Sequence, residues 1–191
     1  MNTPAHAVLN LLLLTRRRER NLDHRECGVI IGGAVMPDLA IIVFYGWQLI
    51  LGRSETQIWS VEYYRPFWQA WIDSFNSIPI VALAMLLSWK ARRHLWLLFF
   101  CSMMLHLLAD LPVHHDDGHR HFFPFSDWRF ASPVSYWDPA HYGYWFSLFE
   151  IGLVAGASLY MARQRPLIRP WVGATVSVYV AYWIYVLAVW V

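Results

Sequence analysis

Charged residues are scarce in this sequence: Asp, Glu, Lys and Arg make up only 15% of its 191 residues. A soluble domain of this length would carry about 25% charged residues. The formal net charge of +2 is also small and excludes the strongly basic character expected of a nucleic-acid-binding protein. Because 58% of the residues are hydrophobic, the composition predicts a membrane protein.

Cysteine is nearly absent, with only Cys27 and Cys101 present, so a disulfide framework is excluded. The N-terminal stretch MNTPAHAVLNLLLLTRRRER does not have the pattern of a secretory signal peptide. Its positive charges follow the apolar run rather than precede it, and no small-residue cleavage site is visible. We therefore expect this segment to be retained.

Long apolar runs are what the sequence has in abundance. Five of them have about the 20 residues needed to cross roughly 30 Å of hydrocarbon, and they cover residues 27–51, 66–89, 94–113, 142–161 and 171–191. The apolar stretch 4–15 is too short to cross and predicts a half-helix or re-entrant segment. No internal repeat or low-complexity linker divides the chain. We expect an all-α, polytopic membrane bundle of about five transmembrane helices plus a short N-terminal half-helix, forming a single domain over residues 1–191.

Basic residues in the short connections predict the orientation of this bundle. They cluster at 16–20, 90–93 and 163–169, which are connections that alternate in topology and therefore lie on one side. Cytoplasmic loops are enriched in Lys and Arg, so we expect this side, with the N-terminus, to be cytoplasmic. Residues 52–65 and the loop 114–141 then face outward. The aromatic-rich stretches WSVEYYRPFW and VSYWDPAHYGYW are typical of interfacial belts.

Polar side chains inside the predicted spans share one depth. Counted at about 1.5 Å per helical residue from the cytoplasmic ends, they lie about 15–25 Å into the membrane. They are His6, Asp38, Asp73, His106, Asp110 and Glu150, accompanied by the neutral Asn10 and Asn76. Ionisable groups inside a membrane are costly and are therefore functional candidates. One such group is often only hydrogen-bonded to a neighbouring helix, but six at one depth favour a shared site.

Metal binding explains this residue set best. His106 and Asp110 are four residues apart and share a helix face. Pro37 is expected to break its helix beside Asp38 and to open a polar cavity there. Histidine and carboxylate ligands from several helices suit Zn²⁺, with Mn²⁺ or Mg²⁺ as alternatives. The predicted ligands are His6, Asp38, His106 and Asp110.

Three more residues are candidates for proton transfer beside the metal, namely Asp73, Glu150 and His119. Asp73 could instead be a further ligand or accept a hydrogen bond from one. Glu150 could equally well pair with Arg120 or Arg129 of the loop, and these arginines could also hold a phosphate.

The loop sequence HHDDGHRH, residues 114–121, follows the third span directly and must fold over the predicted site. It could bind a second metal, act as a lid that supplies ligands to the first, or be a solvated turn. Additional candidate ligands are Asn76, His114, His115, Asp116, Asp117 and His121.

The spacing of three short motifs resembles that of a known family. The motifs are Thr-x-x-His at 3–6, Pro-Asp-Leu at 37–39 and His-Leu-Leu-x-Asp at 106–110, followed by a polar loop that ends at Pro124. In this order they resemble bacterial inner-membrane proteins classed as predicted membrane-bound metal-dependent hydrolases, over about residues 3–124. The resemblance implies a bacterial inner-membrane location and a hydrolytic activity. This chain departs from the family at Asn76, which precedes Ser77 where relatives usually show a His-Ser pair. Asn is a poor zinc ligand, so this departure predicts a weaker site, a harder metal or lost activity.

These observations predict a membrane-embedded metal-dependent hydrolase that acts on a lipid or lipid-linked phosphoester through a metal-activated water. The alternative is a non-catalytic membrane protein that binds or conducts a metal ion or protons through the same His/Asp layer. A lipid phosphatase with a histidine nucleophile also uses an HxxxD pair, but its other motifs are absent from this sequence. Membrane lipid is the expected environment, nucleic acid is not an expected partner, and the sequence does not determine the oligomeric state.

Overall fold

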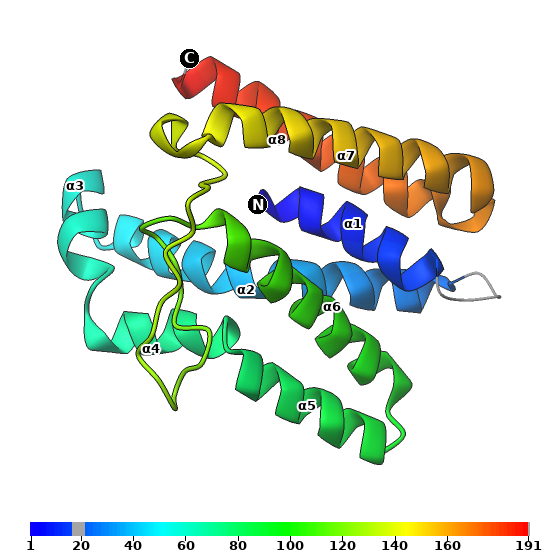
Figure 1. Cartoon of the computed structure of the whole chain (residues 1–191), viewed down its shortest axis with the longest axis horizontal. Helices are drawn as coiled ribbons and strands as arrows, with labels where there is room; N and C mark the ends of the chain where they lie inside the picture. Colours follow the sequence, from blue (N-terminus) through cyan, green and yellow to red (C-terminus); the bar gives the residue numbers. More distant parts are fainter. Residues whose placement is uncertain (17–21, 191) are drawn as a thin grey trace.

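The computed structural model describes residues 1–16 and 22–190, and these residues form helices joined by turns and one long loop (Figure 1). The longer helices are α1 (Thr3–Arg16), α2 (His24–Ile50), α4 (Pro66–Phe75), α5 (Ile78–Lys90), α6 (His94–Asp110), α7 (Gly143–Gln164) and α8 (Arg169–Trp190). The short ones are α3 (Glu55–Gln57), η1 (Ile58–Glu62), η2 (Leu111–Val113), η3 (Pro139–His141) and η4 (Pro166–Ile168). The described chain contains no strand, which confirms the predicted all-α class.

Four of these helical segments are long and apolar enough to cross a membrane: α2, α6 with η2, α7, and η4 with α8. Helices α4 and α5 make a fifth candidate span together, bent by 43° at the break between them. The bend falls at Asn76 and Ser77, where Asn76 caps the end of α4 and the Ser77 hydroxyl accepts a hydrogen bond from the Ile80 N–H at the start of α5. The structure therefore has four helical segments that could span a membrane, or five with the bent pair, in agreement with the predicted bundle of about five.

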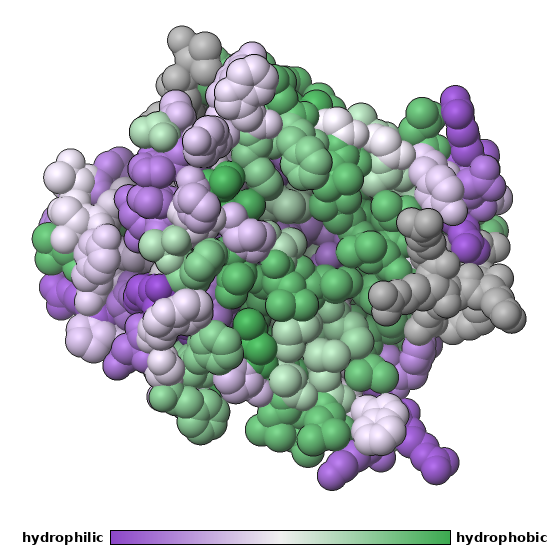
Figure 2. Space-filling view, in the orientation of Figure 1, coloured by the Kyte–Doolittle hydropathy of each residue, from purple (hydrophilic) through white to green (hydrophobic). Residues whose placement is uncertain are grey.

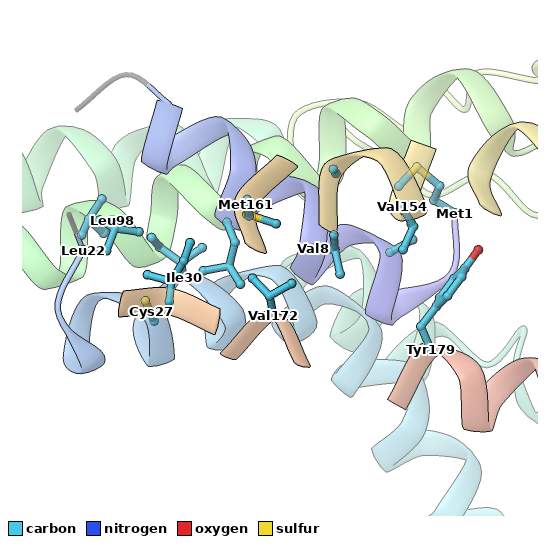
Figure 3. Close-up of a cluster of buried hydrophobic side chains, with 14 residues drawn as sticks. Met1, Val8, Leu22, Cys27, Ile30, Leu98, Val154, Met161, Val172 and Tyr179 are labelled. Atoms are coloured by element: carbon cyan, nitrogen blue, oxygen red, sulfur yellow. The ribbon is translucent and has the colours of Figure 1, made fainter. Parts of the chain in front are cut away.

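Helix α1 is too short to cross a membrane and lies inside the bundle. It packs between the α7–α8 hairpin on one side and helices α2 and α6 on the other (Figure 1). Figure 3 shows apolar side chains of these five helices in one buried cluster, which includes Val8 of α1, Ile30 of α2 and Val172 of α8. The packing of α1 among these helices places its polar residues, His6 and Asn10, in the interior.

Polar groups gather at the two ends of the bundle, while apolar side chains cover its middle (Figure 2). One end carries α3, η1 and the loop 114–141, and we call it the loop end. The opposite end carries the α5–α6 and α7–α8 turns with their basic residues, and we call it the basic end. An apolar band between two polar ends is the surface expected of a membrane-spanning bundle.

Close packing of α2 against α6 depends on Gly33. A Cβ atom at this position would lie 2.2 Å from the backbone oxygen of Phe99 and 3.0 Å from Cβ of Ser102. The helices therefore approach until α6 side chains reach α2 carbonyls: the Ser102 hydroxyl donates to Ile30 O at 2.6 Å, and Nδ1 of His106 lies 2.6 Å from Ala34 O. This approach sets the depth and direction of the His106 ring.

The predicted break at Pro37 is wrong, because α2 continues through this proline from His24 to Ile50. Proline removes one backbone N–H and its ring crowds the preceding turn, but a membrane helix tolerates it where neighbours satisfy the freed polar groups. The helix α6 packs closely against α2 in the turns before Pro37, where Ser102 and His106 contact the Ile30 and Ala34 carbonyls. The kink that the sequence predicted beside Asp38 is found in the structure between α4 and α5.

Replacing Gly33 with alanine is expected to destabilise the protein by about 1–3 kcal/mol, because the new methyl group meets α6 backbone that cannot move aside independently. Gly46→Ala is the matched control in the same helix, since nothing lies within 4 Å of its added Cβ. Thermal unfolding in detergent should show a lower midpoint for Gly33→Ala alone. Equal midpoints for the two variants would contradict the close approach of α2 and α6.

Candidate metal centre

His6, His106 and Asp110 meet in the interior near the loop end of the bundle. One ligand atom from each lies within 4.8 Å of the others, and all three residues are buried. His6 Nε2 lies 2.9 Å from Asp110 Oδ1, and His106 Nε2 lies 2.9 Å from Asp110 Oδ2. A residue from α1 is thus joined to two residues that share one face of α6.

The His106 ring is oriented by a backbone carbonyl. Ala34 O can only accept a hydrogen bond, so Nδ1 of His106 must carry the proton, and Nε2 of the neutral ring keeps its lone pair. Nε2 lies 2.9 Å from Asp110 Oδ2, yet these atoms are not aligned as a hydrogen bond, and no described residue is its hydrogen-bond partner. A metal-ligating histidine usually donates its other N–H to a carbonyl or carboxylate in this way.

Asp38 lies at the edge of this group rather than within it. Its Oδ1 is 3.6 Å from His106 Nε2, and its Oδ2 accepts a hydrogen bond from the Thr3 hydroxyl at 2.5 Å. The Asp38 side chain keeps 22% of its surface exposed, whereas the His106 side chain is fully buried. Of the four predicted ligands, three therefore converge, and the fourth lies next to them on the side open to solvent.

The amino group of Met1 contributes a positive charge to the same place. Its nitrogen lies 2.6 Å from Asp110 Oδ1, and both groups are buried. This ammonium neutralises part of the carboxylate charge and would compete with a metal ion for Oδ1.

Beneath the ligands, Asn10 ties α1 to α6. Its amide group donates to the backbone oxygen of Ser102 at 2.8 Å and to the hydroxyl of Ser102 at 2.9 Å. Because His6 and Asn10 share a face of α1, these bonds fix His6 against His106, and the two rings stack with centroids 3.7 Å apart.

The loop brings three more buried histidines to the site, His114, His119 and His121. His114 Nε2 lies 3.6 Å from Asp110 Oδ2, and its Nδ1 lies 3.0 Å from Asp117 Oδ1. Both ring nitrogens of His114 and His121, and Nδ1 of His119, have no hydrogen-bond partner within the described ranges. Buried polar atoms normally find a partner, so this group has capacity to bind something more.

The protonation of these loop histidines differs. Burial opposes the charge on His114, but the carboxylates of Asp110 and Asp117 outweigh it and raise the pKa of His114 to about 9. Burial, reinforced by His114 and His121, lowers the pKa of His119 to about 3. His119 is therefore neutral at physiological pH, while His114 carries a proton when no other cation neutralises the carboxylates.

The neighbouring loop candidates lie farther from the centre. His115 stacks on His141 with centroids 3.6 Å apart, and its Nδ1 bonds to Ser132 O. Asp116 is exposed, and Asp117 contacts His114 and the indole N–H of Trp137. Asn76 donates to Ile72 O within its own helix, which places it in the α4–α5 bend.

Asp73 anchors the loop to α4. Its buried carboxylate accepts hydrogen bonds from the backbone N–H of Arg120 at 3.1 Å and from Nε of Arg120 at 2.5 Å. Arg129 lies 3.8 Å from the same carboxylate, donates to Gln69 Oε1 at 2.6 Å and donates to Gly118 O at 2.5 Å. The two arginines thus fasten the loop to α4.

Glu150 of α7 anchors Asn2, which precedes α1, in a similar way. Its carboxylate accepts from the backbone N–H and the side-chain amide of Asn2, at 2.9 and 2.6 Å, and from the Tyr179 hydroxyl at 3.0 Å. The alternative pairing of Glu150 with Arg120 or Arg129 is wrong, because both arginines contact Asp73 instead. Catalytic roles for Asp73 and Glu150 remain predictions, and the contacts observed are anchoring ones.

A cavity of about 800 Å³ lies over the centre. Its polar wall includes Asp38, Asp110, His114, His119 and Arg129, and its aromatic wall includes Trp59, Tyr63, Tyr64, Tyr136 and Trp137. Because Trp59 and Tyr64 are exposed, the cavity reaches the surface of the loop end. A ligand entering here would meet Asp110 and His114 at its base.

Sequence reasoning missed the aromatic wall of this cavity. The stretches that contain Trp59, Tyr63, Tyr64, Tyr136 and Trp137 were assigned to interfacial belts, and each of these residues lines the cavity. The same Trp- and Tyr-rich sequence pattern is found at membrane interfaces and in the walls of binding cavities. Only the position of these residues in the fold distinguishes the two roles.

Comparisons with family models, with curated proteins and with solved structures found no match to this chain. Its function is therefore inferred from the arrangement of its own residues.

Proposed function

We propose that this protein is a membrane-embedded metal-dependent hydrolase that acts on a lipid or lipid-linked phosphoester. The observation that carries the proposal is the convergence of His6, His106 and Asp110 in the buried interior, directly beneath a cavity that reaches the surface. The proposal agrees with the resemblance of its motifs to those of predicted membrane-bound metal-dependent hydrolases.

The donors in the centre fit a divalent metal ion. Two imidazoles and one carboxylate are the ligand types that Zn²⁺ takes in catalytic sites, and Mn²⁺ accepts them too. The buried lone pair of His106 Nε2 has no hydrogen-bond partner in the described part of the chain, which is the condition expected of a ligand atom. A metal bound here would act as a Lewis acid and lower the pKa of a coordinated water.

The protein's own residues would position the substrate. An amphiphile could place its apolar part against Trp59 and Tyr64 and its anionic group toward Arg129 and His114. Arginine binds phosphate oxygens through its planar array of N–H donors. Asp38, exposed to the cavity beside His106, is placed to accept a proton from a water held between them.

The orientation follows from the two ends of the bundle. Lys90, Arg92 and Arg93 lie at the basic end together with the basic residues of the α7–α8 turn. By the positive-inside rule we assign this end to the cytoplasm of a bacterial inner membrane, so that the cavity opens toward the outer leaflet. Met1 itself contacts Asp110 near the loop end, so it is the end of α1 at Arg16, and not the first residue, that lies toward the cytoplasmic side.

Conduction of protons or ions through the bundle is less well supported than hydrolysis. The polar layer ends at Asn10 and Ser102, and a buried apolar cluster that includes Leu11, Ile30 and Leu98 follows it toward the basic end. An apolar layer of this kind opposes the passage of charge. A role limited to metal binding remains as the rival to catalysis, and activity measurements separate the two.

Purified protein loaded with Zn²⁺ or Mn²⁺ should hydrolyse at least one phospholipid or soluble phosphoester. His106→Ala is expected to lower this activity by at least about 100-fold, because it removes a ligand rather than an outer partner of the metal. His24→Ala is the matched control, since His24 lies at the basic end and bonds to Trp171. Protein without stoichiometric metal would refute the metal-dependent reading, and metal-loaded protein inactive on all substrates would favour the binding role.

A further inference from the structure

The stacking of His6 on His106 bears on how many ions the centre holds. Their rings are 3.7 Å apart and only 18° from parallel. The lone pair of an imidazole nitrogen lies in the plane of its ring, so two nearly parallel rings direct their lone pairs to separate points. Those points are about one ring separation apart, which matches the roughly 3.5–4 Å between the ions of two-metal sites.

Asp110 is placed to serve both points. Its Oδ1 accepts a hydrogen bond from His6 Nε2 at 2.9 Å, so an ion at this point would replace that proton, and its Oδ2 lies 2.9 Å from His106 Nε2. Each histidine therefore faces its own carboxylate oxygen, as expected when one carboxylate bridges two ions. Two ligands about 2.1 Å from one ion are about 3.4 Å apart in a tetrahedral site and about 3.0 Å apart in an octahedral one, so both contacts are nearest to the spacing around an octahedral ion.

Each point has further charged groups around it. Around Oδ2, the nearest additional donors are His114 Nε2, 3.6 Å from that oxygen, and Asp38 Oδ1, 3.6 Å from His106 Nε2. Around Oδ1, the Met1 ammonium lies at 2.6 Å, so a second ion would have to displace this ammonium from the carboxylate.

The supply of donors also exceeds what one ion can use. Among the residues that the structure describes, the buried ring nitrogens without a hydrogen-bond partner are Nδ1 of His6 and His119, Nε2 of His106, and both nitrogens of His114 and His121. A tetrahedral ion takes four ligands, and Asp110 and Asp38 already provide two carboxylates. His119 lies beside His114, with ring centroids 5.8 Å apart, and so extends the donor set toward the cavity.

We propose that the centre binds two divalent ions side by side, bridged by Asp110, with His6 at one ion and His106 and His114 at the other. This inference rests on the proposed metal site and makes its substrate class more definite. Paired ions at this spacing are typical of enzymes that hydrolyse phosphoesters, where they stabilise both the attacking and the leaving oxygen. The phosphoester is therefore favoured over other bonds of a lipid substrate.

The test is the number of metal ions bound per chain, measured on full-length protein purified in detergent and dialysed against Zn²⁺ or Mn²⁺. Wild-type protein should retain two ions per chain. With two equivalents of Mn²⁺, electron paramagnetic resonance should show the exchange-coupled spectrum of neighbouring ions. His6→Ala and His114→Ala should each retain one ion and give an uncoupled spectrum.

His115→Ala is the matched control, because this loop histidine stacks on His141 and bonds to Ser132 O outside the centre. It should retain two ions and the coupled spectrum. The wild-type count and spectrum test the proposal even if a variant fails to fold. One ion per chain, or two ions without coupling, would overturn the two-ion site and leave the hydrolase proposal standing, whereas no bound metal would overturn both.

Discussion

Asp110→Asn is expected to abolish metal binding at the centre, with affinity falling by more than about 100-fold and hydrolysis of any phosphoester substrate falling to background. Loss of an outer partner of a metal ligand already costs about 10–100-fold in affinity. Asp110 is placed to do more, because both of its carboxylate oxygens face histidine nitrogens. Asparagine has nearly the same shape but only one neutral acceptor oxygen, so the charge that attracts the metal is lost.

Metal content and turnover, measured side by side on wild type and Asp110→Asn, check this expectation. Asp127→Asn is the matched control, since Asp127 also lies at the loop end but its side chain is 90% exposed and pairs only at the surface with Arg120. The control should keep its metal and its activity. If Asp110→Asn kept wild-type metal content, Asp110 would be a structural partner of the Met1 amino group and of the histidines, and the metal centre would have to lie elsewhere.

Asp73→Ala is expected to lower the free energy of unfolding by about 3–5 kcal/mol, the usual consequence of removing one partner of a buried ion pair. Asp73 is 1% exposed and Arg120 is 18% exposed, so the guanidinium would be left without its buried counter-charge. The loop segment that holds His119 and His121 on either side of Arg120 would lose its anchor on α4. Activity should therefore fall together with stability, and metal content should fall with them.

Asp127→Ala is the matched control, because Asp127 pairs with the same Arg120 guanidinium as Asp73 but at the surface. Its exposed pair with Arg120 is worth less than about 1 kcal/mol, so its unfolding midpoint in detergent should stay near that of wild type. If Asp73→Ala instead unfolded like wild type and kept its metal, yet lost turnover, the anchoring role would be contradicted. That result would favour the predicted catalytic role of Asp73.

The helices and the polar layer could be predicted because they depend on local composition. Runs of apolar residues specify membrane spans wherever they occur, and basic residues mark their ends. The spacing of His106 and Asp110 places them on one face of a helix whatever that helix contacts. The convergence of these two with His6 agrees with the predicted ligand set, and their binding of a metal stays a prediction.

The parts that could not be predicted depend on contacts between distant segments. Asp73 and Glu150 have the same depth and chemistry as Asp110, and only the fold directs Asp73 to Arg120 and Glu150 to Asn2. The sequence predicts that Pro37 breaks α2, but the helix continues through it, packed against α6 in the preceding turns. The local sequence around each of these residues does not specify which distant residue it contacts, and that contact decides its role.

The sequence by itself determined that this chain is an all-helical membrane bundle with a set of ionisable residues at one depth, because the cost of exposing polar groups to lipid acts on each residue alone. The tertiary structure decided which of these residues meet. Gly33 lets α6 approach α2, Asn10 fastens α1 to α6, and the loop folds back so that His114 reaches Asp110. A binding site is a geometric relation among side chains from separate helices, and packing alone fixes that relation.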